Sequence, residues 1–282
     1  MKKYWAVLII LILGLGYLLL PNEKTVVVMG TTLRVKGDGA RLAIDEVKRL
    51  DRLFSRFEPE SDISKVNRAA GNGPVVVAKE TFDLVATSFL LSDLSGGAFD
   101  LTLGRNGNYR AIVLDSKNRT IFLRHKGMSL DLGGIGKGAA VESARRKLLA
   151  DGAKKTLIDM HSSIAVIGGP WKIGVIDPRE ARPGMSSNLL EVVTLNDGDA
   201  LSTSGGYEQP GHIIDPRSGR VANRCLGVTV ITRDAAIADA LSTAIFVLGP
   251  EQGLKLANKL AAKAVIVDGK GKINDNFSVK LR

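Results

Sequence analysis

Residues 131–138, Asp-Leu-Gly-Gly-Ile-Gly-Lys-Gly, run directly into the stretch 139–152, AAVESARRKLLADG, which has the residue pattern of an amphipathic helix. The four glycines of the loop let the backbone bend tightly and approach a ligand closely, because they carry no Cβ atom. The first N–H groups of the helix should point outward unpaired, beside the positive end of its dipole. A phosphate suits this position, and Lys137 would add a charge to it. Because the spacing matches neither a P-loop nor a dinucleotide fingerprint, a glycine-rich turn without a ligand is an equally good interpretation.

Strand-like and helix-like segments alternate irregularly on both sides of this loop. Apolar residues at helical spacing, or capping residues, predict helices over 40–57, 61–67, 81–94, 139–152, 235–248 and 251–262. Residues rich in β-branched side chains predict strands within 25–35, 155–169, 171–178, 189–195, 200–204, 211–215, 227–234 and 264–269, and a hairpin over 113–123. Since there is no regular βαβ period, the expected fold is α+β, one domain with a mixed or antiparallel sheet and packed helices over residues 25–282.

The N-terminus differs from the rest of the chain. Residues 4–20, YWAVLIILILGLGYLLL, carry no charge and follow Lys2 and Lys3. The run is at the short end of what spans a bilayer, and the lysines predict a cytoplasmic N-terminus with the body on the far side. A cleavable signal peptide is the alternative, although no small-x-small site follows. We therefore expect residues 1–24 to be a transmembrane anchor, or an uncleaved signal, with a short tether. The catalytic domain would then lie on the periplasmic side of the inner membrane.

Composition limits the possible partners and metals. The formal net charge is +10, but the basic residues are scattered and aromatic residues make up only 5% of the chain, so a nucleic-acid-binding platform is not expected. A basic surface suits an anionic membrane, but simple solubility is the better explanation of the charge. With one cysteine and three histidines, the chain cannot build a thiolate-rich zinc site. A metal would be held by oxygen atoms, which favours Mg²⁺ or Ca²⁺.

Two segments carry residues suited to chemistry. The segment Asp239-Ala-Leu-Ser-Thr243 lies in a predicted helix, where its first and last residues share one face and could bind one hard cation together with Ser242. The ordinary interpretation is a polar helical turn. His212 begins a short apolar strand and has the side chain best suited to general-base chemistry near neutral pH, although a lone histidine is more often structural.

The order of several short motifs carries more information than any one of them. The motifs are Met29-Gly-Thr31, FSRFEPESDISKVN (54–67), SGGAFDLTLG (95–104), LDLGGIGKG (130–138), WKIGVIDP (171–178), STSGGYE (202–208), HIIDPRSG (212–219) and ADALSTAIFVLG (238–249). In this order the chain resembles the ApbE family, the FAD:protein FMN transferases. The resemblance spans residues 25–265.

The resemblance implies a reaction and its partners. A threonine hydroxyl of a membrane-associated acceptor would attack the phosphorus of the FMN half of FAD, and AMP would leave. Typical acceptors are subunits of sodium-pumping quinone reductase (Nqr) or Rnf-type electron-transport complexes. By the same resemblance, Mg²⁺ would be held by the carbonyl of Gly134 with Asp239, Ser242 and Thr243, and His212 would assist the acceptor hydroxyl. Residues implied to line the FAD site are Met29, Phe57, Ala98, Phe99, Asp100, Asp131, Lys137 and Ile213.

The chain departs from the family pattern at a few positions. His161-Ser-Ser163 replaces a common Gly-Gly-Asn segment, and Ser204-Gly-Gly-Tyr207 lacks an acidic residue that the family often has. The cysteine of a lipoprotein is absent, and the predicted anchor replaces it. Two other functions fit the same motifs: an Mg²⁺-dependent FAD pyrophosphatase that uses water as the acceptor, and an exported FAD-binding protein without catalytic activity.

Overall fold

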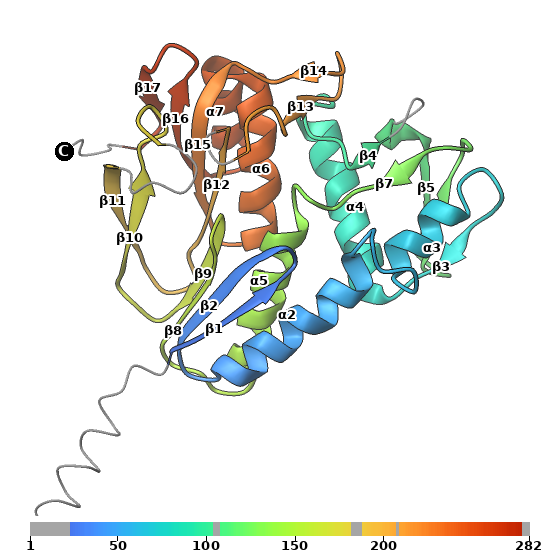
Figure 1. Cartoon of the computed structure of the whole chain (residues 1–282), viewed down its shortest axis with the longest axis horizontal. Helices are drawn as coiled ribbons and strands as arrows, with labels where there is room; N and C mark the ends of the chain where they lie inside the picture. The colour runs from blue at the N-terminus through green and yellow to red at the C-terminus, as the bar shows by residue number, and fades with distance from the viewer. Residues whose placement is uncertain (1–22, 104–107, 182–187, 207–208, 278–282) are drawn as a thin grey trace, which may run out of the picture.

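A computed structural model of the chain describes residues 23–103, 108–181, 188–206 and 209–277. Its centre is an eight-stranded sheet of order β1-β2-β8-β9-β12-β15-β16-β17, in which every neighbouring pair is antiparallel (Figure 1). The strands are β1 Glu23–Val28, β2 Thr31–Gly37, β8 Thr156–Met160, β9 Ser163–Ile167, β12 Ala200–Gly205, β15 Cys225–Thr232, β16 Lys263–Asp268 and β17 Ile273–Asp275. The sheet, with helices packed on it, confirms the expected α+β fold class.

The prediction of a single strand over 25–35 is wrong. This segment forms the β1–β2 hairpin, in which Val28 pairs with Thr31 across a two-residue turn. Met29 and Gly30 both have positive φ angles, 51° and 71°, which is the backbone that tight hairpin turns require. Glu23 and Lys24, which the sequence assigned to a tether, belong to β1 and pair with β2.

The two faces of the sheet are covered by different elements. Helices α5 (Gly136–Ala150) and α6 (Ala235–Leu248) cover one face, and the hairpin of β10 (Trp171–Ile176) and β11 (Leu189–Leu195) covers the other (Figure 1). Because side chains alternate along a strand, successive residues enter different cores. Ile158, for example, belongs to the helix-side core and Leu157 to the core under the hairpin.

A second group of elements extends from the helix side of the sheet. Helix α2 (Ala40–Phe54) packs on α5 and leads to this group (Figure 1). The other members are α3 Asp62–Arg68, β3 Val75–Val76, α4 Lys79–Leu94, β4 Thr102–Leu103, the 3₁₀ helix η1 Tyr109–Ala111, β5 Ile112–Asp115, β6 Thr120–Leu123 and β7 Ser129–Leu130. Ser61 caps α3, as its sequence predicts, and the Asp62 carboxylate accepts a hydrogen bond from the Ala78 N–H at the start of α4. The predicted hairpin over 113–123 is the β5–β6 pair.

The C-terminal part completes the sheet and adds a small hairpin. Asp234 caps α6. Gly249, with a φ angle of 82°, ends that helix immediately before α7 (Pro250–Lys259). Strands β13 (Ile214–Asp215) and β14 (Arg220–Val221) form the small hairpin. The predicted anchor falls almost wholly on residues 1–22, outside the described residues. In the part of the chain that the structure describes, no helix is long and apolar enough to cross a membrane.

Candidate functional site

The glycine-rich loop 131–138 closes on itself before α5 begins. The Asp131 carboxylate accepts a hydrogen bond from the Gly133 N–H at 2.8 Å, and the Gly136 N–H donates to the Leu132 carbonyl at 2.6 Å. The Gly138 N–H donates to the Asp239 carboxylate of α6 at 2.9 Å. The expectation that the first N–H groups of this helix point outward unpaired is therefore wrong for Gly136 and Gly138. A tight turn uses one of them, and a neighbouring helix uses the other.

Asp239 joins α5, α6 and the sheet. Its side chain is buried, with 4% of the residue exposed. One carboxylate oxygen accepts from the Gly138 N–H, and the other accepts from the Ser202 hydroxyl of β12 at 3.2 Å. Each oxygen keeps a further lone pair, since a carboxylate offers about four acceptor sites. The carboxylate is thus held in one orientation without being saturated.

Hydroxyl groups of β12 and α6 lie directly beside Asp239. The Ser204 and Ser242 hydroxyl oxygens are 2.8 Å apart, and Ser204 is 3.2 Å from the Thr243 hydroxyl. Ser242 is fully buried and donates to the Asp239 carbonyl, whereas Thr243 is partly exposed. Ser202 and Ser204 both belong to the motif STSGGYE (202–208), but neither of them was expected beside Asp239 from the sequence. The period-two alternation of β12 is the signal that places both on the face covered by α6.

These groups suit a hard divalent cation. A Cβ atom built on Gly134 would lie 3.6 Å from the Thr243 hydroxyl oxygen, so the loop borders the helix face that carries Asp239. Among the described residues, no group of three or more His, Cys, Asp or Glu side chains could hold a metal ion. The donor set is one carboxylate with hydroxyl and carbonyl oxygens. That set fits Mg²⁺, which is commonly bound through one or two carboxylates plus substrate phosphates and water.

The aromatic and apolar candidates border the same loop from two sides. Phe99 is 4% exposed, and its ring edge would be 3.2 Å from a Cβ on Gly134. Ala98 beside it is 1% exposed. Met29 reaches over from the β1–β2 turn, where its methyl carbon would lie 3.7 Å from a Cβ on Gly136. The loop glycines therefore leave room for side chains from distant parts of the chain.

Phe57 is placed differently from Phe99. Its ring is 79% exposed, and the Arg56 guanidinium lies over it at 4.6 Å from the ring centre. Arg56 also pairs with the Asp131 carboxylate at 3.3 Å. Arg56 thus contacts both the exposed ring of Phe57 and the glycine-rich loop.

The charged candidates Asp100 and Lys137 make local contacts. One Asp100 oxygen accepts from the N–H and hydroxyl of Thr102, and the other accepts from the Tyr109 N–H at 3.1 Å. Asp100 therefore organises its own loop. The Lys137 ammonium donates to the Gly133 carbonyl at 3.3 Å, so its charge lies over the glycine-rich loop.

His212 lies on an exposed segment before β13. Its Nδ1 is hydrogen-bonded to the Gln209 carbonyl, and Ile213 beside it is buried. A Cβ on Gly97 would lie 3.8 Å from the Arg217 Cγ atom, which places the β13–β14 hairpin against the segment leading to Phe99. Among the described contacts, neither His212 nor Phe57 forms a hydrogen bond or ion pair with the group formed by Asp239, Ser242 and Thr243.

A family model described as the ApbE family matches residues 29–107 and 105–266 of the chain. A Klebsiella pneumoniae (strain 342) protein named FAD:protein FMN transferase is 31% identical over 241 residues, covering 73% of this chain and 74% of that protein. A Vibrio cholerae protein of the same name is 26% identical over 279 residues, covering 81% and 82%. The crystal structure of the ApbE protein from Thermotoga maritima has a TM-score of 0.80 at 28% identity, covering 91% of this chain and 97% of that one. The residues matched by the family model include every candidate from Met29 to Thr243.

Proposed function

Because the chain belongs to the ApbE family, we propose that it is an enzyme, an FAD:protein FMN transferase that moves FMN from FAD to another protein. In this proposal the reaction requires Mg²⁺, the acceptor group is a threonine hydroxyl, and AMP is released. The observation that carries the proposal is the convergence of Asp239, Thr243 and the Gly134 loop at one place. Asp239 and Thr243 lie one turn apart on α6, whereas the Gly134 loop lies about a hundred residues earlier in the sequence.

The metal requirement is supported by the oxygen atoms gathered there. The Gly134 carbonyl, the Asp239 carboxylate and the Ser242 and Thr243 hydroxyls would hold the ion. When bound, Mg²⁺ neutralises charge on the pyrophosphate of FAD and stabilises the departing AMP. Asp239 is already oriented for this task by Gly138 and Ser202, so little rearrangement is needed.

The proposed role of His212 follows from its hydrogen bond. A carbonyl oxygen can only accept, so the contact with Gln209 places the ring proton on Nδ1 and leaves Nε2 free to accept a proton. His212 would take the proton of the acceptor threonine as its oxygen bonds to the phosphorus of the FMN half. The bond from that phosphorus to the AMP oxygen then breaks. The exposed position of His212 suits an acceptor that is itself a protein.

The proposed location rests on the sequence alone. The uncharged run 4–20 behind Lys2 and Lys3 would anchor the enzyme in the inner membrane, with the catalytic domain outside the cytoplasm. Acceptors of the Nqr or Rnf type would lie at the same surface. Digestion of spheroplasts with an external protease tests this, because a catalytic domain on the cytoplasmic side would be protected.

The transferase proposal is tested by mixing the full chain with FAD, Mg²⁺ and a candidate acceptor protein, and measuring the intact mass of the denatured acceptor. The expected result is a gain of one FMN that is lost when the metal is chelated. The gain should also be lost when the target threonine of the acceptor is replaced by alanine. Free FMN and AMP with an unmodified acceptor would contradict the transferase and indicate the pyrophosphatase instead.

A further inference from the structure

Helices α5 and α6 cap each other at their N-termini. The Gly138 N–H in the first turn of α5 donates to the Asp239 carboxylate of α6 at 2.9 Å. In return, the Ala235 N–H at the first residue of α6 donates to the Glu142 carboxylate of α5 at 3.1 Å. Positions 138 and 142 are four apart on one helix, and 235 and 239 are four apart on the other, so each pair shares a face. The carboxylates of Asp239 and Glu142 thus fix the position of α6 along the axis of α5.

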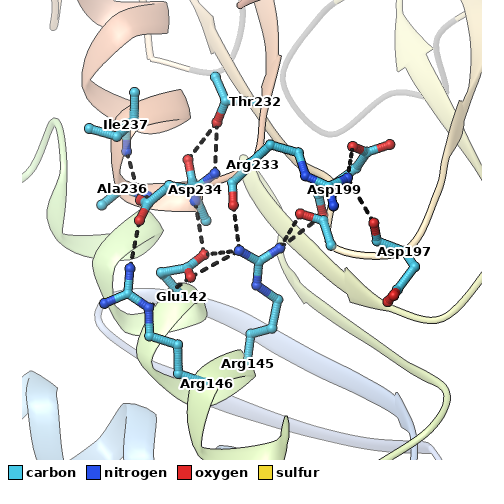
Figure 2. Close-up of polar contacts among 12 residues, drawn as sticks. Glu142, Arg145, Arg146, Asp197, Asp199, Thr232, Arg233, Asp234, Ala236 and Ile237 are labelled. Carbon is cyan, nitrogen blue, oxygen red and sulfur yellow. Dashed lines mark hydrogen bonds and ion pairs between the residues drawn. The ribbon is translucent and has the colours of Figure 1, made fainter.

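Glu142 is itself locked by a buried arginine. Glu142 and Arg145 are each 5% exposed, and their side chains pair at 2.7 Å. Arg145 donates a further hydrogen bond to the backbone carbonyl of Arg233, before α6 (Figure 2), and another to that of Gly198, before β12. The segments that precede β12 and α6 are therefore tied, through Arg145, to one carboxylate.

The contact between the two helices leaves no free space. A Cβ atom on Gly138 would lie 2.2 Å from the Ala235 carbonyl oxygen and 2.7 Å from the Asp239 Cβ atom. A small shift of α6 along α5 would therefore move Asp239 relative to both Gly138 and Ser202. The orientation of the Asp239 carboxylate depends on the position of the first turn of α6, which Glu142 holds.

We propose that Glu142 is a positioning residue for the metal site, because it holds the first turn of α6 at the depth where Asp239 can bind the ion. This inference rests on the proposed Mg²⁺-dependent function. Within the described part of the chain, no recorded hydrogen bond or ion pair joins Glu142 to a candidate metal ligand. Replacing a residue that orients a metal ligand typically lowers the metal affinity or the activity by about 10- to 100-fold.

Glu142→Gln is the informative variant because it keeps the size of the side chain. One of its two oxygens becomes an NH₂ group, which cannot accept a hydrogen bond. The remaining oxygen alone cannot serve Ala235, Arg145 and Arg146 as the carboxylate does, and the charge that pairs with Arg145 is lost. Glu142→Asp is the second variant, since it keeps the charge beside Arg145 but draws the carboxylate back from Ala235.

Glu46→Gln is the matched control. Glu46 is 3% exposed and also hydrogen-bonds α5, through Ser143 and Lys147, but on the side that faces α2. Its replacement disturbs the ion pairs of a buried carboxylate, those with Arg49 and Lys147, without touching the contact between α5 and α6. A merely structural role for Glu142 would make the two glutamates behave alike.

The experiment titrates the full chain with Mn²⁺ in the presence of FAD and without acceptor, following the loss of the free Mn²⁺ signal by electron paramagnetic resonance. We expect Glu142→Gln and Glu142→Asp to weaken Mn²⁺ binding by about 10-fold or more, while Glu46→Gln binds as the wild type does. FAD binding measured in chelator should be unchanged in all three variants.

Three results would overturn the inference. Mn²⁺ affinities of both Glu142 variants within twofold of wild type would remove Glu142 from the metal site and leave the proposed function intact. An equal loss of Mn²⁺ affinity in Glu46→Gln would show that the Glu142 variants act through general destabilisation of the protein. A wild-type protein that binds no Mn²⁺ would instead reject the metal-dependent function and, with it, the role of Glu142.

Discussion

A methyl group at position 138 is predicted to push α5 and α6 apart. In Gly138→Ala the new Cβ atom would lie 2.2 Å from the Ala235 carbonyl oxygen and 2.7 Å from the Asp239 Cβ atom. The first of these is a backbone atom, which cannot turn aside as the end of a side chain can. The helices must therefore separate, and the hydrogen bond from position 138 to the Asp239 carboxylate must lengthen.

The magnitude follows from three opposing terms. Alanine is about 1 kcal/mol better than glycine inside a helix. Overpacking a close contact costs about 1–3 kcal/mol. Weakening a hydrogen bond to a buried carboxylate costs about 1.5–3 kcal/mol. We therefore expect the free energy of unfolding to fall by about 1.5–5 kcal/mol.

Urea unfolding of the full chain, followed by far-ultraviolet circular dichroism, measures this change. Gly136→Ala is the control, since a Cβ there would meet Leu132 and Met29 at 3.6 and 3.7 Å, which is ordinary contact. That variant should change stability by less than about 1 kcal/mol. If Gly138→Ala proves as stable as Gly136→Ala, the close approach of α5 to α6 is refuted.

Four further results are expected. The hydrogen bond to Arg49 is the main cause that lowers the pKa of Glu46 from 4.5 to about 2, so Glu46 stabilises the fold above pH 4.5 and this effect is lost as the pH falls toward 2. In acid unfolding, the wild type should therefore lose about 3 kcal/mol of its free energy of unfolding in this window, whereas Glu46→Gln should not. Burial raises the pKa of the Cys225 thiol to about 12, so Ellman's reagent at pH 8 should react with it only after denaturation. Asp239→Asn should lower FMN transfer by about 100-fold or more, with a circular dichroism spectrum like that of the wild type. His212→Gln should slow transfer to the acceptor by about 100-fold while FAD binding is kept, and an unchanged rate would remove His212 from the mechanism.

Local sequence signals predicted most of the secondary structure. Helix α6 begins and ends where the capping Asp234 and the Gly249-Pro250 pair indicate, and α3 begins after the capping Ser61. The β1–β2 hairpin was missed because Met29, unlike Asn or Asp, gives no sign that it adopts a positive φ angle. Its neighbour Gly30 was the one available signal of a turn.

The sequence by itself determined the helices and many of the strands, the expectation that any metal would be held by oxygen atoms, and the motif series that leads to the ApbE family. Only the tertiary structure decided which groups meet. The Gly138 N–H is used by Asp239, a residue 101 positions away, and the Ala235 N–H is used by Glu142, 93 positions away. Ser202 joins the same group through the pairing of strands. Periodicity and capping report on neighbours within a few residues, whereas these contacts depend on how two helices pack on a sheet, to within a fraction of an atomic diameter.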